Sequence, residues 1–328
     1  MELLGTKPRV IVVGIGAVGG TLAAALSLAG HEVVGVARGK QLDAIRHHGL
    51  RLKTSTSDRV AEFECVGSFG DIELRPNDLI LIGVKSQDTP EVFEQLRHAG
   101  AYQHAIFCTQ NGIANEREGQ RYFPNVHGMT VMMPSMYLTP GEVAVFGAPR
   151  FGILDVGRAQ AGVDDADKAL VALLASANFA AFTSTDIMAS KRAKLLLNLG
   201  NVVQAALGLG ADTGDIVSRL YAEAQDVYRA RGLTWLDISK PDPRLEKFMQ
   251  VVPVDGAQRV GGSTVQSLLR DTGSIETDYL NGEIVLQARL AGVEAPLNAA
   301  MARLGRRLLQ DRAKPGSMTL AQLEAHLE

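Results

Sequence analysis

Three glycines near the start of the chain have the spacing G-x-G-x-x-G. They are Gly14, Gly16 and Gly19, with Ala17 and Val18 between the second and the third. Between a strand and a helix, the first glycine permits a tight turn, the second lets backbone approach a pyrophosphate, and the third lets the helix pack on the strand. The start of that helix offers N–H groups and partial positive charge to phosphates. We therefore expect these five residues to bind a dinucleotide.

Basic residues follow the next strand-like segment, in the sequence Ala37-Arg38-Gly39-Lys40. Sites selective for NAD have an acidic residue here, about twenty residues past the glycines, where it binds the ribose hydroxyls. A carboxylate would repel a 2′-phosphate, whereas a guanidinium binds one through two hydrogen bonds. We therefore expect Arg38 to select NADP(H); the alternative is that Arg38 is a solvated loop cation.

Two more polar residues stand where predicted strands end. Lys85 follows the strand pattern at residues 78–84, and Asn111 follows the pattern at residues 105–109. Ligands of doubly wound sheets bind beyond the carboxyl ends of strands, so we expect both side chains on the nicotinamide side of a cleft. Asn111 precedes Gly112, and Asn-Gly is also a strong turn dipeptide. A plain turn is therefore an equal alternative for Asn111.

Four polar residues recur along one predicted helix at residues 187–209. Lys191, Lys194, Asn198 and Asn201 are spaced i, i+3, i+7 and i+10, which places them on one face. Leucines and valines fill most other positions, so the helix is predicted to be largely buried. Buried lysine and asparagine need partners or a wet cavity, which indicates a stripe that faces a cleft. The alternative is a stripe on the outer surface.

Two shorter polar segments follow in the helical part of the chain. The first, S-T-V-Q-S at residues 263–267, contains Ser263 and Thr264. The second, I-E-T-D-Y-L-N-G at residues 275–282, contains Glu276. We expect Glu276 to begin a helix that Ser274 caps, where the carboxylate could be no more than favourable first-turn charge.

Strand and helix patterns alternate as far as residue 185. We predict strands at residues 10–14, 31–37, 78–84, 105–109, 126–133 and 179–183, antiparallel strands at 143–146 and 151–154, and helices at 21–30, 89–99 and 164–177. After residue 185 the patterns are helical, at residues 187–209, 214–230, 262–272, 276–291 and 297–310, and the tail 313–328 has a weak helical pattern. The expected fold is therefore an α/β Rossmann-type doubly wound sheet, residues 1–185, which binds NADP, followed by an all-α substrate and catalytic domain, residues 186–328.

Composition and charge exclude several classes of protein. Residues 10–30 are largely apolar, but glycines interrupt them and their period changes, which favours a strand and a helix over a membrane span or signal peptide. A net charge of −3 argues against nucleic acid as a partner. Cys65 and Cys108 are far apart, with no ligand cluster, so we expect a reducing cytosol, no disulfide framework and no metal. The sequence does not give the oligomeric state, and a homodimer is one alternative.

Several of these motifs together resemble the ketopantoate reductase (2-dehydropantoate 2-reductase) family. They are the glycine motif, Arg38, Q-N-G at residues 110–112, K-L-L-L-N at 194–198 and S-I-E-T-D-Y-L-N-G around Glu276. The resemblance covers both domains in the right order. Its specific part is K-L-x-x-N followed later by E-x-D-Y-x-N-G.

The resemblance implies NADPH-dependent reduction of 2-dehydropantoate to pantoate, a step toward pantothenate. Lys194 would be the general acid, and Glu276 would support it and bind the hydroxyl of the substrate. The other residues that the resemblance implies are Asn111 and Asn198 for holding the substrate, Ser263 or Thr264 for its carboxylate, and Lys85 beside the cofactor.

The chain departs from the family pattern at two places. The family often has a second asparagine eight residues after the lysine, where this chain has Val202. It also has an asparagine three residues before the carboxylate-binding hydroxyl, where Gly261 or Gly262 falls. On an ideal helix Asn201 points nearer to Lys194 than Val202 does, so we expect Asn201 to replace the missing amide. Otherwise the pocket suits a 2-oxo acid that lacks the extra hydroxyl.

Three other functions are compatible with this domain plan. A sibling of the family would reduce a different 2-oxo acid, and an NADP-sensing binding protein would keep the fold without the reaction. A 3-hydroxyacid or opine-type dehydrogenase would need a histidine as acid and base, but after His127 the chain has only His326, in the tail. A histidine mechanism would therefore need one of the histidines of the N-terminal domain. Retention of both Lys194 and Glu276 favours catalysis over sensing.

Overall fold

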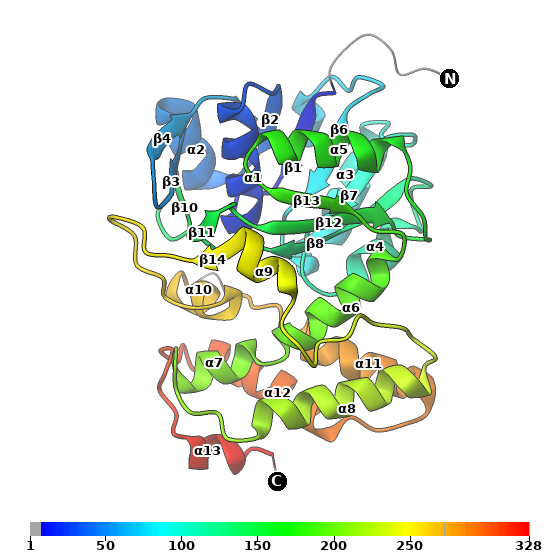
Figure 1. The fold of residues 1–328 in the computed structure, drawn as a ribbon, viewed down its shortest axis with the longest axis vertical. Helices are drawn as coiled ribbons and strands as arrows, with labels where there is room; N and C mark the ends of the chain where they lie inside the picture. Colours follow the sequence, from blue (N-terminus) through cyan, green and yellow to red (C-terminus); the bar gives the residue numbers. More distant parts are fainter. Residues whose placement is uncertain (1–7, 272, 328) are drawn as a thin grey trace. The chain divides into compact units, whose positions relative to one another are not determined.

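The structure is a computed structural model that describes residues 8–271 and 273–327, and the chain forms two compact units (Figure 1). The first unit runs to Gln110 and takes in Asn115–Met188 and Ile238–Gln258. The second comprises Asn111–Ala114, Ala189–Asp237 and the chain from Arg259 onward. The first seven residues of the predicted first domain, the last residue of the predicted helix 262–272 and the last residue of the tail lie outside the described residues.

An eight-stranded sheet organises the first unit. Its order is β13-β12-β8-β7-β6-β1-β2-β5, and every neighbouring pair is parallel except β12 and β8. The strands are β1 (Val10–Val13), β2 (Val33–Val36), β5 (Glu64–Val66), β6 (Leu79–Ile82), β7 (Ala105–Cys108), β8 (Val126–Met132), β12 (Ile153–Arg158) and β13 (Ala180–Thr183). The chain leaves β1 toward β2 on one side and returns to β6 on the other, so a switch point lies between β1 and β6.

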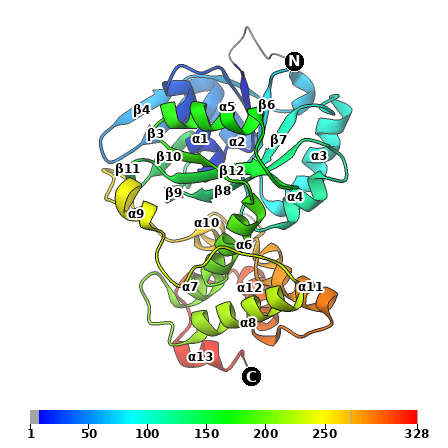
Figure 2. The same ribbon diagram turned by 45° about the vertical axis from the view of Figure 1, so that its right-hand side comes forward.

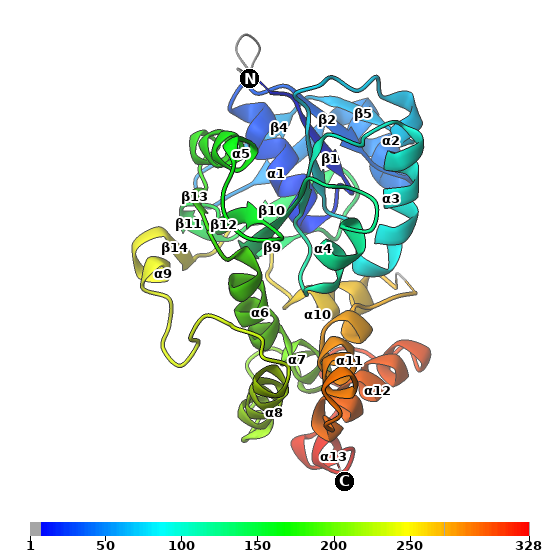
Figure 3. The same cartoon turned by 90° about the vertical axis from the view of Figure 1, so that its right-hand side faces the viewer.

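The central strands are apolar at every position because helices cover both faces of the sheet. Val10 and Val12 contribute to one core cluster, and Ile11 and Val13 to another. The first cluster includes residues of α1 (Ala17–Leu28) and α5 (Asp165–Ser176), and the second includes residues of α3 (Thr89–His98). Figure 3 shows α1 and α3 on opposite sides of β1 and β2. This arrangement confirms the expected doubly wound sheet.

A buried ion pair joins the starts of the two strands at the switch point. Arg9 donates from Nε to Asp78 Oδ1 at 2.9 Å and from Nη2 to Asp78 Oδ2 at 2.6 Å. Both side chains are almost fully buried, with exposed fractions of 6% and 0%. Nη2 of Arg9 also donates to the carbonyl of Glu73, and Oδ2 of Asp78 also accepts from the backbone N–H of Arg75. This ion pair with two hydrogen bonds therefore holds β1 and β6 in register, at the end of the strands opposite the glycine turn.

Two small sheets complete the first unit. One has the order β4-β3-β10-β9, and the other pairs β11 with β14. The expected antiparallel strands at residues 143–146 and 151–154 are present in different sheets: β10 pairs antiparallel with β9, and β12 pairs antiparallel with β8. Each also has a parallel neighbour, β3 for β10 and β13 for β12. The strands are β3 (Leu50–Lys53), β4 (Asp58–Ala61), β9 (Ser135–Met136), β10 (Glu142–Val145), β11 (Gly147–Pro149) and β14 (Met249–Val251), and the remaining helices of this unit are α2 (Gly39–His48), α4 (Ala114–Gly119) and α9 (Pro243–Phe248).

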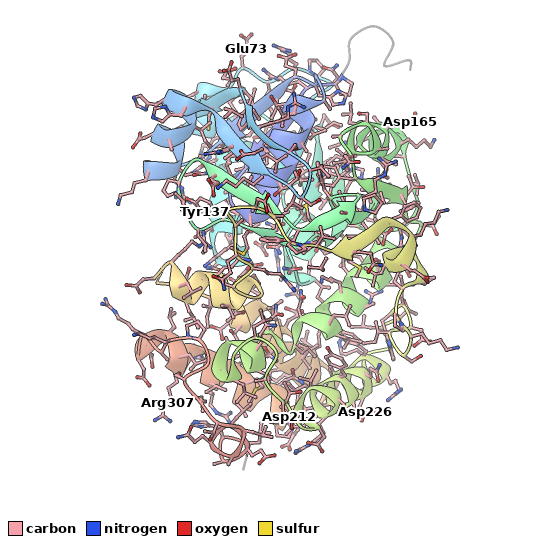
Figure 4. All side chains as sticks on the ribbon, turned by 60° about the vertical axis from the view of Figure 1, so that its left-hand side comes forward. Glu73, Tyr137, Asp165, Asp212, Asp226 and Arg307 are labelled. Carbon is pink, nitrogen blue, oxygen red and sulfur yellow. The ribbon has the colours of Figure 1, made fainter. Side chains whose placement is uncertain are left out.

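The second unit is built from helices (Figure 2). They are α6 (Ile187–Asn198), α7 (Asn201–Leu207), α8 (Ile216–Ala230), α10 (Ser263–Leu269), α11 (Asn281–Ala291), α12 (Pro296–Gln310) and α13 (Leu320–Glu324). On α12, Met301, Leu304 and Leu308 are buried, whereas Arg307 is exposed on the opposite face. Figure 4 labels Arg307 and Asp226, an exposed carboxylate of α8. The apolar faces of α8, α11 and α12 pack against one another.

The division between the units differs from the predicted boundary after residue 185 in two segments. The chain passes between the units near there, at Met188–Ala189, but Ile238–Gln258 returns to the first unit and Asn111–Ala114 belongs to the second. The return is made by β14, whose Gln250 and Val251 are exposed, so the segment carries no buried strand pattern. Within residues 8–271 and 273–327, no helix combines the length and apolarity that crossing a membrane requires.

Candidate active site

The glycine turn at the end of β1 is shaped by two very close backbone contacts. Gly14 has φ of +99°, and a Cβ there would lie 2.6 Å from the backbone nitrogen of Val84, just past the end of β6. A Cβ on Gly19 would lie 2.1 Å from the carbonyl oxygen of Gly14. Both glycines are therefore needed for the fold itself: the first turns the chain beside β6, and the second brings α1 onto the turn.

Gly16 differs because its missing side chain faces open space. A Cβ built on Gly16 meets no heavy atom within 4 Å. Gly16 is the N-cap of α1, no side chain caps that end, and the first turn has no acidic residue. Ala17 and Val18 follow and are partly buried. A helix start with uncapped N–H groups beside an open glycine, at the switch point of the sheet, fits the pyrophosphate of a dinucleotide.

Arg38 lies just beyond the end of β2, as its position in the sequence predicts. It is the N-cap of α2, and its side chain is 64% exposed. The nearest carboxylate is that of Glu91, 3.9 Å from Nη1 and itself 61% exposed, so the pair is weak and easily exchanged for another anion. Lys40 is also exposed. The end of β2 therefore presents positive charge.

The segment after β6 contains Lys85. This residue is partly buried and is the N-cap of a short 3₁₀ helix, Ser86–Asp88, where its carbonyl accepts a hydrogen bond from the N–H of Asp88. Since Gly14 packs on Val84, Lys85 lies beyond the same strand end as the glycine turn. This placement matches the expectation that it stands at a carboxyl end of the sheet.

Asn111 belongs to the helical unit, although it follows a strand of the first unit. The adjacent Gly112 has φ of +83°, and a Cβ there would lie 2.9 Å from the carbonyl oxygen of Tyr279. The glycine is thus required by both its backbone conformation and a close contact with the segment that follows Glu276. Asn111 is partly buried beside this contact. The Asn-Gly pair is therefore more than a surface turn.

The polar stripe on α6 is largely buried. Lys191 is 2% exposed, Asn198 is 5% exposed and Lys194 is partly buried. Asn201, the fourth predicted member, is also partly buried but lies on α7. An outer face would expose these side chains as it exposes Leu197, at 39%. The alternative of a stripe on the outer surface is therefore wrong. The helix presents leucine outward at that position and turns its amine and amide groups inward.

Two polar groups of this stripe, the amine of Lys194 and the amide of Asn198, lack the water or hydrogen-bond partners that such groups normally have. Burial removes water from the Lys194 amine and lowers its pKa from the ordinary value of 10.5. One turn later, Nδ2 of Asn198 is buried without a hydrogen-bond partner among the described residues. Because an unsatisfied buried donor costs about 1–3 kcal/mol, such a donor calls for a partner, which is either a ligand or a water molecule.

The predicted helix 187–209 is interrupted at Leu199 and Gly200. Helix α6 ends at Asn198, and α7 begins at Asn201. Gly200 favours the interruption because glycine has low helix propensity. The carbonyl of Leu199, which no longer bonds within a helix, accepts a hydrogen bond from Nδ2 of Asn281. Beyond it, Val202 is 1% exposed and belongs to the core, while Asn201 is only partly buried.

The segment before α10 is held by α7. The backbone N–H of Gly262 donates to Oε1 of Gln204 at 2.7 Å. A Cβ on Gly262 would lie 3.5 Å from Oδ1 of Asn201, so the amide of Asn201 borders the space that a side chain at 262 would take. We expected the asparagine of the family pattern to fall at Gly261 or Gly262, and this chain has an amide side chain at neither position.

Helix α10 contributes hydroxyl groups at two successive turns. Thr264 is 3% exposed and Ser263 is partly buried. Ser267, one turn after Thr264, is also 3% exposed. We had not predicted a role for Ser267, although its spacing of three residues from Thr264 on a helix is the signal that could have found it. Both hydroxyls face the buried side of α10.

Glu276 precedes a 3₁₀ turn rather than beginning a regular helix. It is the N-cap of the turn Thr277–Tyr279, its carbonyl accepts from the N–H of Tyr279, and α11 starts only at Asn281. The expectation of a helix starting at Glu276 is therefore wrong. The physical reason is close packing: a Cβ on Gly305 of α12 would lie 2.6 Å from Oγ1 of Thr277, so the turn presses onto α12.

The first unit is a doubly wound sheet with a glycine turn at its switch point, and the helical unit contains a buried lysine–asparagine stripe. These two features are typical of the class of two-domain oxidoreductases of Rossmann type. The chain belongs to the ketopantoate reductase family. The family model described as "Ketopantoate reductase PanE/ApbA" matches residues 10–158, and its C-terminal counterpart matches residues 186–308.

Individual relatives support this assignment. A 2-dehydropantoate 2-reductase from Archaeoglobus fulgidus is 26% identical over 91% of this chain and 97% of its own length. One from Caulobacter vibrioides is 27% identical over 90% and 97%. The crystal structure of a PanE/ApbA family ketopantoate reductase from Ralstonia eutropha JMP134 is 27% identical, with a TM-score of 0.74 over 93% of this chain and 99% of that one.

A structure of another named activity has the same fold. The complex of D-mandelate dehydrogenase with NADH matches 92% of this chain and 99% of its own, with a TM-score of 0.74 at 20% identity. At that identity the similarity concerns the fold alone. The fold therefore occurs with more than one named substrate, and the choice of substrate has to be argued from the side chains.

Proposed function

We propose that this protein reduces a 2-oxo acid with NADPH, and that its substrate is 2-dehydropantoate. The observation that carries the proposal is the pair formed by Lys194 and Asn198 on α6. A desolvated amine and an unsatisfied buried amide, one helical turn apart, are suited to an oxygen-bearing ligand. A purely structural stripe would have its donors satisfied within the protein.

The first unit supplies the proposed binding site for the cofactor. Gly16, Ala17, Val18 and the start of α1 would bind the pyrophosphate, with Gly14 and Gly19 holding the turn, and Arg38 would bind the 2′-phosphate. Lys85, beyond the neighbouring strand β6, would lie toward the nicotinamide. NADPH, when bound, supplies the hydride for reduction of the ketone.

Lys194 is the proposed general acid. Hydride addition to a ketone leaves an oxygen that needs a proton, and a donor within hydrogen-bond reach lowers the barrier. The charged amine of Lys194 polarises the carbonyl and then delivers a proton from Nζ. Because burial lowers its pKa, this amine gives up a proton more readily than an exposed lysine. Glu276 would favour the charged amine and accept a hydrogen bond from a substrate hydroxyl.

The remaining polar residues of the helical unit are proposed to hold the substrate. Asn198 donates through its free Nδ2, and Asn111 lies on the segment that packs on the turn after Glu276. Ser263 and Thr264 would bind the carboxylate, with Ser267 as the buried hydroxyl one turn further on.

Asn201 supports 2-dehydropantoate over a simpler 2-oxo acid. Val202 is in the core and offers no amide, whereas Asn201 borders the space beside Gly262. A second amide there would pair with the extra hydroxyl of 2-dehydropantoate. The alternative, a sibling enzyme for a 2-oxo acid without that hydroxyl, follows if the amide of Asn201 serves only the helical unit, since an unpaired buried hydroxyl costs about 1–3 kcal/mol.

The test is NADPH oxidation with a panel of 2-oxo acids that includes 2-dehydropantoate and its 4-deoxy analogue, in wild type and Asn201→Ala. A wild-type preference for the hydroxylated compound that shrinks in Asn201→Ala supports the proposal. A preference for the 4-deoxy analogue would assign the enzyme to another 2-oxo acid. NADPH binding without turnover of any compound would mean that the protein is a sensor. Asn125→Ala, at a partly exposed amide of the first unit that donates to the carbonyl of Gln103, is the control.

A histidine mechanism has less support. His127 is fully buried on β8, where Nδ1 lies 2.8 Å from Oδ1 of Asp167 and its ring stacks on Phe107. The other histidine relevant to that mechanism, His326, follows α13 in the tail. Neither belongs to α6 or to the segment around Glu276, so the dehydrogenase classes that use histidine are disfavoured.

A further inference from the structure

A chain of buried polar groups crosses the interior of the helical unit. Asn281 is 1% exposed and Asn298 is 0% exposed. Nδ2 of Asn281 donates to the carbonyl of Leu199 at 3.2 Å and to Oδ1 of Asn298 at 3.1 Å. Nδ2 of Asn298 donates in turn to the carbonyl of Leu220 at 3.3 Å and to Oε1 of Glu223 at 2.9 Å.

The direction of this chain is determined by its last members. The carbonyl of Leu220 and the carboxylate of Glu223 only accept hydrogen bonds, so the NH₂ group of Asn298 must face them. Its oxygen then faces Asn281, whose NH₂ group must point back to it. Glu223 also accepts from the N–H groups of Leu297 and Asn298 at the start of α12. The orientation of the Asn281 amide is therefore fixed by the carboxylate of Glu223 on α8 and by its hydrogen bonds to the start of α12.

Asn281 stands between the two segments that carry the proposed proton-transfer residues. It bonds the carbonyl of Leu199, which directly follows Asn198 at the end of α6. Terminal carbonyls of a helix lack intrahelical partners, so this bond satisfies one of them and fixes where α6 stops. Asn281 is also the first residue of α11, separated only by Leu280 from the turn Thr277–Tyr279 that follows Glu276. Thr277 of that turn packs against Gly305.

We infer that Asn281 is a positioning residue, which holds the carboxyl end of α6 and the Glu276 turn in one fixed geometry. This inference rests on the proposed function, because it assigns the consequence to Lys194 and Asn198. Without the bond to Leu199, the end of α6 loses its partner from α11. The side chains of Lys194 and Asn198, on the last two turns of α6, then no longer keep one fixed position relative to a bound substrate. Misplacement of reacting groups by about 1 Å can cost about 100-fold in rate.

The experiment compares Asn281→Ala and Asn281→Ser with Leu308→Ala in the full-length protein. Leu308 is 4% exposed on α12, so its truncation destabilises the same unit without removing a member of the amide chain. For Asn281→Ala we expect kcat to fall about 10- to 100-fold, the pH dependence of kcat to change, and the dissociation constant for NADPH to stay within about twofold. Asn281→Ser, which keeps one short donor, should fall between wild type and Asn281→Ala.

A second readout does not depend on activity. Hydrogen exchange of backbone amides at residues 195–203 should accelerate in Asn281→Ala and remain as in wild type in Leu308→Ala. If Asn281→Ala changes neither kcat nor this exchange, the inference is overturned. It is also overturned if Leu308→Ala, at an equal loss of stability, reproduces both effects. If Lys194→Ala leaves turnover unchanged, the proposed function fails, while the exchange comparison still decides whether Asn281 holds the end of α6.

Discussion

Replacing Gly16 with alanine separates cofactor binding from folding. The added methyl meets no protein atom within 4 Å, and the backbone of Gly16, with φ of −96° and ψ of −152°, is open to alanine. The folding cost is therefore limited to a poorer N-cap, at most about 1 kcal/mol. A bound pyrophosphate would be kept roughly 1.5 Å further from the backbone, about one carbon–carbon bond. Losing one charge-assisted hydrogen bond costs about 1.5–3 kcal/mol, or about a 10- to 150-fold rise in Kd.

The assay pairs NADPH titration by fluorescence with urea unfolding, and Gly19→Ala is the matched variant. A Cβ at position 19 would lie 2.1 Å from the carbonyl oxygen of Gly14, so Gly19→Ala should lose about 1–3 kcal/mol or more of stability. We expect Gly16→Ala to change Kd with little change in the unfolding midpoint. The reasoning is refuted if Gly16→Ala binds NADPH as wild type does, or if its stability falls as far as that of Gly19→Ala.

Other predictions concern charge. Arg38→Ala should raise KM for NADPH about 10- to 100-fold and leave KM for NADH nearly unchanged, because only NADPH carries the 2′-phosphate; equal losses in the two steady-state assays would contradict this role. If Lys194 is the general acid, as proposed, its amine must be protonated for reduction, and burial lowers the pKa of that amine. A rate–pH profile should therefore show kcat falling as pH rises through a value below 10.5, and the same fall in Lys194→Met would belong to another group. Lys194→Met should lower kcat by about 10²–10⁴-fold. It should also raise the free energy of unfolding at neutral pH, because the folded wild type must bury a charge there, and this gain should shrink as pH rises above the folded pKa. Asp78→Asn should cost about 3–5 kcal/mol in denaturant unfolding by leaving Arg9 buried without its countercharge; a loss below 1 kcal/mol would mean that Arg9 finds another partner.

The elements that local pattern controls were predictable from the sequence. The charge-free run of β1 is buried on both faces, and Gly14 and Gly19 after it meet close backbone contacts of the kind their spacing implies. The polar stripe of α6 was also correctly predicted to be inward, because a helix that is apolar elsewhere has no outer face for Lys191 and Asn198. In each case the information lies within a few residues of the feature.

Features controlled by distant partners were not predictable in this way. The interruption after Asn198 depends on Asn281, which is far along the chain, so the local pattern reads as one helix. The turn after Glu276 is pressed against Gly305 rather than continuing as a helix. Strand β14 is short and mostly exposed, and only its pairing with β11 makes it a strand. No local periodicity carries these contacts.

The pairing of β11 with β14 has a consequence for how the protein is made. Because the first unit includes Ile238–Gln258, a ribosome must synthesise much of the helical unit before the first unit has all its strands. Until then β11 exposes an edge with unpaired backbone groups, which invites pairing with other chains. A gene fragment cut after residue 185 would leave that edge uncovered permanently. Separate expression of the first unit therefore requires residues 238–258 to be rejoined through a linker.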